Sequence, residues 1–281
     1  MTGEEIAAAG QLACLLEVSA PKPGNVSPDR HFHDTRYEDF LASAVAIGPA
    51  LAAAGTRPLG ASIRAAVDAT ARWTSSNTNL GIVLLLAPLA RAAARAGGGL
   101  RSRLAAVLEE TTVADAADAY FAIRRARPGG LGAASAEDVA AAPTVTLVQA
   151  MALAADRDAI AREYTTRFAL TFEVGAPALA AARGRGLPWS DATLECFLSL
   201  LGAVPDTHVA RKLGRAEAER LSARAREVTA AGGTASAEGR AALAAFDAEL
   251  RDPRNTRNPG TTADLTCAAL FVVILEHGWH R

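Results

Sequence analysis

Lysine is nearly absent from this chain of 281 residues, in which only Lys22 and Lys212 occur. Arginine supplies the other positive charges: lysine plus arginine total 29 against 30 for aspartate plus glutamate, a net charge of -1. Binding to nucleic acid calls for a basic stripe, so this balance argues against a nucleic-acid partner. The two lysines are exceptions, and both lie in polar segments described below.

Cysteine is also scarce, and the cysteines are not paired in the sequence. Cys14, Cys196 and Cys267 are scattered without CxxC spacing, which argues against a disulfide framework and against a zinc site. All three lie in apolar stretches and are predicted to be buried thiols. No GxxxxGK[ST] sequence occurs, so a P-loop is excluded.

Hydrophobic runs long enough to cross a bilayer are missing. The longest, residues 81–94 and 265–275, are too short and are predicted to be core helices. The first ten residues carry two glutamates and no basic segment, so they do not predict a signal peptide. We therefore expect a cytoplasmic protein with no membrane partner.

Signals for β-strands are weak as well. Aromatic residues make up 5% of the chain, and long stretches show no alternation with a period of two. Half of the chain is hydrophobic and alanine dominates this set, which favours helices. We predict an all-α fold with one domain over residues 1–281, a multi-helix array whose polar loops converge on one cleft.

The predicted helices cover residues 2–18, 37–54, 59–73, 80–96, 104–110, 113–126, 147–155, 157–183, 188–201, 205–230, 235–251 and 261–278. Residues 128–143 are rich in glycine, alanine and proline and are predicted to form a long surface loop. Structureless loops of this length are uncommon, so this one could act as a substrate lid.

The first of four polar segments follows the first predicted helix, at residues 17–26. Its Pro-Gly pair, Pro23 and Gly24, suits the centre of a type II turn, and a proline on either side keeps Lys22 extended. An exposed lysine on a rigid turn could bind a phosphate as a point charge. The alternative is a plain connector with a solvated lysine.

The second polar segment, residues 31–39, lies at the start of the next helix. Asp34, Glu38 and Asp39 could bind Mg²⁺ or complement the helix dipole. His31 and His33 lack a third ligand nearby and are interpreted as surface residues.

The third polar segment, Asn77 to Gly81, precedes an apolar helix. Its amide and hydroxyl groups could cap that helix or bind an anion or a nucleobase at its N-terminus. Gly81 would let a ligand approach the backbone closely.

The fourth polar segment has two parts. After Pro205, a helix begins at Asp206, and His208, Arg211 and Lys212 share one of its faces. Residues 258–264 form a second Pro-Gly turn before an apolar helix. Asp264 falls in the first turn of that helix, where it could cap the helix or ligate a metal.

In order along the chain, these segments resemble the motif series of the triphosphoribosyl-dephospho-CoA synthase family. The matching residues are Glu17 with PKPG at 21–24, Asp34, residues 77–81, residues 206–212 and residues 259–264. The family has His and Lys where this chain has Asn79 and Leu80, and an apolar residue where it has Asn25. The chain is thus similar to a divergent branch of the family.

This resemblance implies an all-α enzyme in which the 2′-hydroxyl of dephospho-CoA attacks C1′ of the ATP ribose and adenine leaves. The implied partners are ATP and a dephospho-CoA-like acceptor, with Mg²⁺ as cofactor; the chain could form a homodimer. We predict Glu17 and Asp206 as catalytic carboxylates, and Asp34 and Asp264 as metal ligands. Predicted contacts to ATP and its phosphates come from Lys22, Gly24, Asn25, Asn77, Thr78, Asn79, Gly81, His208, Arg211, Lys212, Gly260, Thr261 and Thr262.

Two other functions are compatible with the sequence. The departures at Asn79 and Leu80 leave open a metal-dependent hydrolase of nucleotide or ADP-ribosyl glycosides. A non-catalytic helical protein that binds nucleotides is the third interpretation, and it predicts that the polar segments are scattered over the fold.

Overall fold

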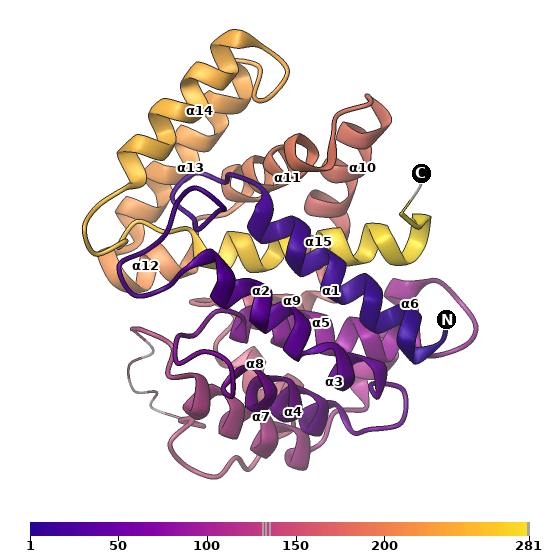
Figure 1. The fold of residues 1–281 in the computed structure, drawn as a ribbon. Helices are drawn as coiled ribbons and strands as arrows, with labels where there is room; N and C mark the ends of the chain where they lie inside the picture. Colours follow the sequence, from indigo (N-terminus) through magenta and orange to yellow (C-terminus); the bar gives the residue numbers. More distant parts are fainter. Residues whose placement is uncertain (131, 133, 135, 280–281) are drawn as a thin grey trace.

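A computed structural model describes residues 1–130, 132, 134 and 136–279, and every regular element in this part of the chain is a helix (Figure 1). The all-α prediction is confirmed. The helices are α1 (Gly3–Ser19), α2 (Tyr37–Ala46), α3 (Gly48–Ala52), α4 (Leu59–Thr70), α5 (Leu80–Ala93), α6 (Leu100–Glu109), α7 (Val113–Ala126), α8 (Leu147–Ala152), α9 (Ala159–Thr166), the π-helix η1 (Leu170–Gly175), α10 (Ala176–Gly184), α11 (Trp189–Ala203), α12 (Thr207–Leu213), α13 (Arg215–Ala230), α14 (Ala237–Leu250) and α15 (Gly260–His277).

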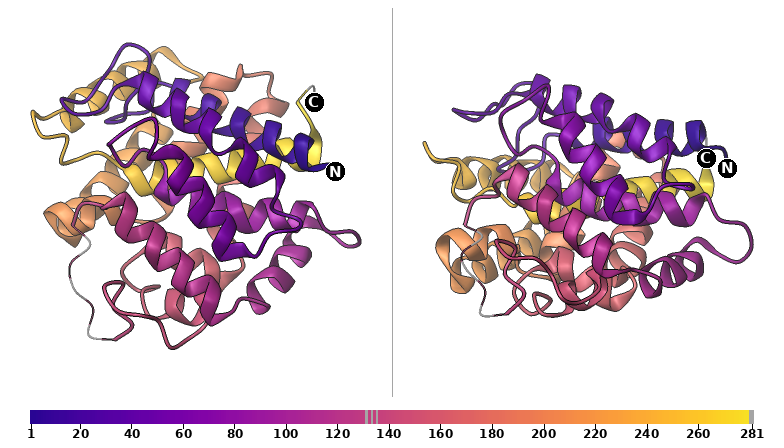
Figure 2. Two further views of the ribbon diagram at one scale, coloured as in Figure 1. Left: turned by 60° about the horizontal axis from the view of Figure 1, so that its bottom comes forward. Right: turned by 90° about the horizontal axis from the view of Figure 1, so that it is seen from below.

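The centre of the fold is α15, which packs against α1, α5, α11 and η1. In both views of Figure 2, α1 lies along α15. By length and composition α15 could cross a membrane, but 72% of its span is buried inside the fold. A helix that is apolar on all sides suits this central position.

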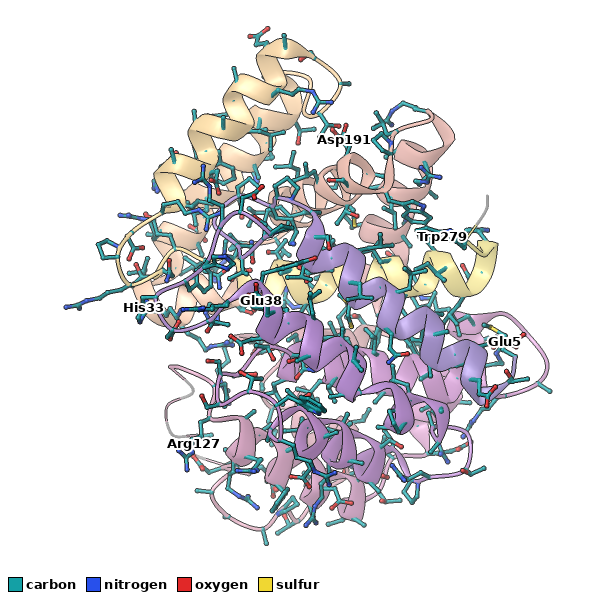
Figure 3. The ribbon with its side chains drawn as sticks, in the orientation of Figure 1. Glu5, His33, Glu38, Arg127, Asp191 and Trp279 are labelled. Carbon is teal, nitrogen blue, oxygen red and sulfur yellow. The ribbon has the colours of Figure 1, made fainter. Side chains whose placement is uncertain are left out.

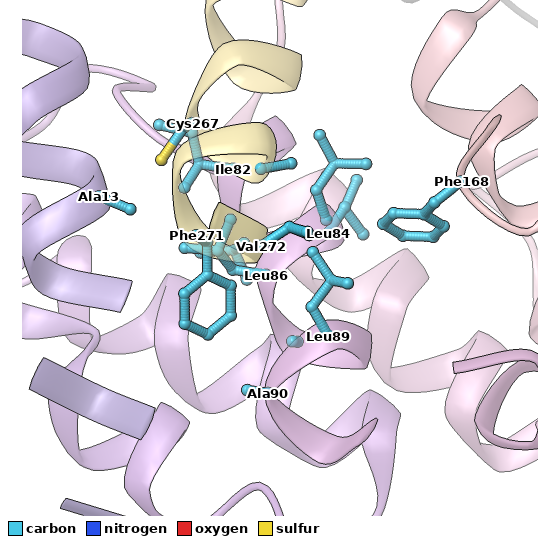
Figure 4. Close-up of a cluster of buried hydrophobic side chains, with 14 of the residues drawn as sticks. Ala13, Ile82, Leu84, Leu86, Leu89, Ala90, Phe168, Cys267, Phe271 and Val272 are labelled. Atoms are coloured by element: carbon cyan, nitrogen blue, oxygen red, sulfur yellow. The ribbon is translucent and has the colours of Figure 1, made fainter. Parts of the chain in front are cut away.

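The main core forms where α5 and α15 meet. Leu86 and Leu89 of α5 pack in one cluster with Phe271 and Val272 of α15, and Phe168 joins them (Figure 4). Nearly every residue of α5 is buried, including Ile82. The two helices that carry this core also carry two of the polar segments at their first turns, so core packing sets the spacing of those segments.

A second, smaller core holds together the lobe made of α11 to α14. Phe197 and Leu201 of α11 pack in one cluster with Leu221 of α13 and Phe246 of α14. The helices α13 and α14 form a hairpin at the top of Figure 1. The lobe connects to the rest of the fold through α11 and α12, both of which pack on α15.

Three of the predicted helices are interrupted. The helix expected over residues 37–54 breaks at Ile47, because Pro49 starts the separate helix α3. The helix expected over residues 157–183 ends where Arg167 and Phe168 adopt left-handed backbone angles, with φ of 54° and 58°. Gly214, with φ of 91°, separates α12 from α13.

Candidate active site

A cavity of about 370 Å³ opens where the first turns of α5, α9, α12 and α15 meet the last turn of α1. Thr207 of α12 joins two of these ends: its hydroxyl accepts from Ala159 N of α9 at 3.3 Å and lies 3.1 Å from Thr261 Oγ1 of α15. Helix N-termini carry unpaired N–H groups and the positive end of the helix dipole. Aspartates cap α9 and α12, whereas the N-cap residues of α5 and α15 make no side-chain cap, so these two first turns give one end of the cavity an anion-binding character.

Most of the residues predicted from the sequence line this cavity. They are Glu17, Asn25, Asn77, Thr78, Asn79, Gly81, His208, Arg211, Gly260, Thr261 and Asp264. The others, Lys22, Gly24, Asp34, Asp206, Lys212 and Thr262, do not line it.

Glu17 and Asp264 are two carboxylates of the cavity that come from the packed helices α1 and α15. The side chain of Glu17 is almost buried, and one of its oxygens lies 2.9 Å from Lys22 Nζ. Burial raises the pKa of Asp264 well above its usual range, and the negative charge of Glu17 raises this pKa further. The free protein therefore favours the protonated form of Asp264.

Lys22 is not the exposed turn residue that the sequence predicted. Its side chain is 0% exposed and is oriented back toward the last turn of α1. Besides Glu17 Oε1, the ammonium donates to the backbone carbonyls of Glu17 and, at 3.2 Å, of Ala20. We expect Lys22 to contribute to stability, because removing it would leave a buried carboxylate unpaired.

Asp206 lies behind the cavity wall rather than in it. Its Oδ1 accepts from Val209 N at 2.9 Å, and its Oδ2 accepts from both N and Oγ1 of Thr262 at 2.7 Å. Burial raises its pKa, and these hydrogen bonds oppose that effect. Asp206 caps α12 and ties it to the start of α15, so the structure gives it a structural position outside the cavity lining.

Asp34 and Lys212 lie outside the cavity. The side chain of Asp34 is 61% exposed, next to His33 at the edge of the molecule (Figure 3). Lys212 is exposed and has Asp206, Asp252 and Asp34 as its acidic neighbours. The structure thus does not bring Asp34 to Asp264 as a pair of metal ligands.

Gly24 and Thr262 support the cavity from outside. Gly24 has φ of 74°, and its N–H donates to Asp247 Oδ1 at 2.8 Å. A side chain at Gly24 would press against Leu250 and Pro259, so this turn needs glycine for space as well as for its backbone angle. Thr262 serves as the partner of Asp206.

The segment from Asn77 to Gly81 is held by hydrogen bonds to its neighbours. Asn77 Oδ1 accepts from Leu80 N at 3.1 Å, Thr78 Oγ1 lies 2.5 Å from Ser43 Oγ, and Asn79 Nδ2 donates to Thr70 Oγ1 at 3.0 Å. Asn79 and Leu80, where the chain departs from the family pattern, both line the cavity. The departures therefore change the surface that a ligand would meet.

His208 and Arg211 form the basic side of the cavity. Burial, together with the charges of Lys212 and Arg211, lowers the pKa of His208 to about 3, so its imidazole is neutral at physiological pH. Arg211 donates to Asp158 Oδ2 at 2.7 Å. Its buried Nε and the buried Oδ1 of Asn258 have no hydrogen-bond partner within the described part of the chain. Both groups remain available for a polar ligand.

Several polar residues that line the cavity were not predicted as site residues, among them Arg157, Asp158 and Asn258. Asp158 is the N-cap of α9, where Oδ1 accepts from Ile160 N at 2.9 Å and Ala161 N at 3.1 Å. An aspartate directly before an apolar run is a recognised helix-start signal. The predicted helix began at residue 157, so Asp158 was placed inside the helix and not at its N-cap.

His208 should make the stability of the protein depend on pH. Its folded pKa of about 3 lies below the unfolded value near 6.5, so the unfolded chain binds a proton first as the pH falls. The stabilisation is present above pH 6.5 and is lost below it, by about 1.4 kcal/mol at pH 5.5. Urea unfolding at pH 7.5 and 5.5 should show this loss, and His208→Gln should abolish it. The exposed His33→Gln is the control; equal pH dependence of wild type and His208→Gln would contradict the prediction.

At Gly81, α5 approaches α15 closely at the cavity. A Cβ on Gly81 would overlap with Asp264 Oδ2 and press on the end of the Ile160 side chain. Since both are side-chain atoms, we expect Gly81→Ala to fold but to displace the Asp264 carboxylate.

If Asp264 is needed for activity, Gly81→Ala should lose about a hundredfold in rate, as expected for a misplacement near 1 Å. The matched control is Gly184→Ala in α10, where a Cβ would meet nothing within 4 Å. It should keep full activity. Turnover and melting temperature of both variants test this, and an active Gly81→Ala would count against the close approach.

Comparisons with known proteins match this chain to one family. A profile of the ATP:dephospho-CoA triphosphoribosyl transferase family matches residues 3–281. A crystal structure from Archaeoglobus fulgidus, described as a triphosphoribosyl-dephospho-CoA synthase, is similar with a TM-score of 0.65 and 28% identity, covering 85% of this chain and all of that one.

Curated relatives match over shorter stretches. The 2-(5''-triphosphoribosyl)-3'-dephosphocoenzyme-A synthase of Klebsiella pneumoniae is 38% identical over 109 residues, which is 39% of this chain and 36% of that protein. A protein of Stutzerimonas stutzeri, named as a probable synthase of the same kind, is 37% identical over 105 residues, again 36% of its length. The aligned parts thus span about a third of these relatives. With the family profile covering nearly the whole sequence, the chain belongs to the ATP:dephospho-CoA triphosphoribosyl transferase family.

Proposed function

We propose that the protein transfers the triphosphoribosyl group of ATP to the 2′-hydroxyl of 3′-dephospho-CoA, or of a related cofactor precursor, with release of adenine. The observation that carries the proposal is the shared cavity of Glu17, Asp264 and Arg211, in which two carboxylates lie beside an anion-binding end. Family membership and the names of the relatives support the choice of substrates.

The triphosphate would bind where the helix N-termini meet. Phosphates are bound well by the N–H groups of helix first turns, and here α5 and α15 supply such turns at Gly81 and Thr261. Arg211 and Arg157 are the only arginines or lysines among the described residues that line the cavity. They replace Lys22 and Lys212 as the proposed cationic partners of the phosphates.

The carboxylates suit chemistry at a sugar carbon. Displacement of adenine from C1′ passes through a state that resembles an oxocarbenium ion, which a nearby carboxylate stabilises. We propose that Glu17 accepts the proton of the attacking 2′-hydroxyl as the new C1′–O bond forms and the bond from C1′ to adenine breaks. The adenine leaves with the electron pair of that bond and takes up one proton, which balances the proton given to Glu17. His208, neutral and half-buried, can donate or accept one hydrogen bond to orient a substrate.

Magnesium fits this cavity as a companion of ATP rather than as a resident ion. The described residues include no cluster of three or more His, Cys, Asp or Glu side chains that could hold a metal. Mg²⁺ is commonly held by one or two carboxylates together with substrate phosphates, and Asp264 can supply such a carboxylate. When bound, the ion would neutralise triphosphate charge.

Charge balance gives a reason to expect the ion. Glu17, Asp158 and Asp264 line the cavity together with Glu137 and Asp138, against two arginines. A triphosphate would enter this acidic cavity more readily with its charge partly neutralised.

The test is to incubate the protein with Mg-ATP, with and without dephospho-CoA, and to measure free adenine by chromatography. Adenine that appears only with the acceptor supports the transfer. Release without acceptor would instead indicate a hydrolase of nucleotide glycosides. Binding of Mg-ATP without any adenine release would indicate a non-catalytic nucleotide-binding protein.

A further inference from the structure

Lys22 is one of the largest fully buried side chains of the protein, and it is the only charged one among them in the described chain. An ammonium has three N–H donors. Three oxygens surround it: Glu17 Oε1 at 2.9 Å, the carbonyl of Glu17, and the carbonyl of Ala20 at 3.2 Å. Each donor therefore has an acceptor within the protein, and none is left for a ligand.

The local sequence explains why this side chain is oriented inward. The chain turns at once after α1: Lys22 N donates to Ala20 O at 2.8 Å, and Asn25 N donates to Lys22 O at 3.1 Å. Pro21 and Pro23 have no N–H to donate, and their fixed φ angles restrict the backbone conformation of the turn. The last carbonyls of a helix lack partners within it, and a cation placed there satisfies them and complements the helix dipole. Lys22 fills this role for α1.

Glu17 is the link between Lys22 and the cavity. It lines the cavity with 4% of its surface exposed, whereas Lys22 does not line it. The ion pair uses Oε1, and no hydrogen bond joins Oε2 to another described residue. One oxygen is thus oriented by the ammonium, and the other is available to a substrate.

We propose that Lys22 is a positioning residue, which orients the Glu17 carboxylate in the cavity and balances its charge, and that it does not bind phosphate. The proposal rests on the proposed function in one respect, that Glu17 takes the proton of the attacking hydroxyl. It accounts for a lysine at this place, since the buried carboxylate next to Asp264 needs a counter-charge that occupies no space in the cavity.

A comparison of two variants separates positioning from phosphate binding without any need for turnover. Glu17→Gln and the double variant Glu17→Gln/Lys22→Met both lack the carboxylate, and the double variant also avoids an unpaired buried charge. We expect their Kd values for Mg-ATP, measured by calorimetry, to agree within about twofold. A tenfold or greater weakening in the double variant would assign Lys22 to the phosphates and overturn the proposal.

Kinetics of the single variant Lys22→Met supply the second readout. Positioning predicts a kcat for adenine release that falls by ten- to a hundredfold with KM for ATP unchanged within about twofold, because only the geometry of the base is lost. A raised KM with unchanged kcat would contradict it. Should this variant fail to fold, the comparison of the two Glu17→Gln variants still decides.

The scarcity of lysine allows a third test that needs no substrate. Labelling with ¹⁵N-lysine gives two ammonium signals, and the one that survives in Lys212→Met belongs to Lys22. We expect this signal to exchange slowly with water and to lose that protection in Glu17→Gln. If it exchanges as fast as that of Lys212, the buried pair is absent and the proposal fails, whereas a wild-type protein that releases no adenine would refute only the proposed function.

Discussion

Asp264→Asn should lower adenine release by about a thousandfold while making the folded protein more stable at neutral pH, not less. The loss of rate follows from the position of Asp264 in the cavity beside Glu17, where we propose that it supplies a carboxylate for the reaction or for Mg²⁺. Asparagine keeps the shape of the side chain but cannot take either role.

The gain in stability follows from the sign of the pKa shift. Burial and the charge of Glu17 raise the pKa of Asp264 in the folded state, so folding favours the protonated group. Its stabilising contribution is complete below the unfolded pKa and is lost as the pH rises toward the folded pKa. An asparagine never ionises and avoids that loss, so the difference in melting temperature between variant and wild type should widen from pH 5 to pH 8.

The control is Glu217, a carboxylate whose pKa is lowered rather than raised in the folded state. Hydrogen bonds from Arg220 and Arg257 lower the pKa of Glu217 to about 2, so Glu217→Gln should destabilise at pH 7 and become neutral near pH 2. Thermal melts of both variants at several pH values, with adenine assays at pH 7.5, test the pair. An Asp264→Asn protein that melts lower than wild type at pH 8, or keeps its activity, would contradict the assignment.

The helical nature of the fold could be predicted from composition, but the breaks inside the helices could not. No glycine or proline marks the change of direction at Arg167 and Phe168. It is held by the buried Glu163 carboxylate, which accepts from N of Leu170 and from N and Oγ1 of Thr171 at 2.5–2.9 Å. Such a break depends on a side chain that accepts hydrogen bonds from backbone N–H groups about a turn away. Hydrophobic periodicity carries no information about such hydrogen bonds.

The polar segments predicted where the cavity lies better than they predicted what each residue does. A cluster of polar residues between apolar helices predicts a site because helix building does not need it. The burial of a side chain, however, depends on packing with residues that are distant in the sequence. Leu250 and Pro259 lie close to Gly24, in the same turn as Lys22. The sequence around Lys22 is the same whether that turn faces solvent or the core.

For Gly81, too, the sequence predicted the place of the residue in the site but not the group that contacts it. Its position in a first turn predicted that a ligand could approach the backbone there, and in the structure the Asp264 carboxylate lies next to it. The two residues are far apart in the sequence, so no local pattern could name the partner. Asp158, by contrast, carried a local cap signal, an aspartate directly before an apolar run, which a start of the predicted helix at residue 159 would have used.

Several residues predicted to belong to the site lie outside the cavity. Apart from Lys22, we expect Asp206 to be the one whose replacement by alanine destabilises the protein most. Asp206→Ala removes the acceptors of Val209 N, Thr262 N and Thr262 Oγ1, and it loosens the tie between α12 and the first turn of α15. A lost cap together with unsatisfied buried donors costs about 2–4 kcal/mol, which for a chain of this size lowers the melting temperature by roughly 5–15 °C.

Asp34→Ala is the matched comparison, because Asp34 was also predicted to act in the site but has an exposed side chain. It should change the free energy of unfolding by less than about 0.5 kcal/mol. Assayed well below its melting temperature, folded Asp206→Ala should keep activity within about tenfold of wild type, because its carboxylate does not line the cavity. A variant that melts like wild type yet loses activity a thousandfold would return Asp206 to the catalytic role predicted from the sequence, since a residue that only joins two helices cannot stop the chemistry without weakening the fold.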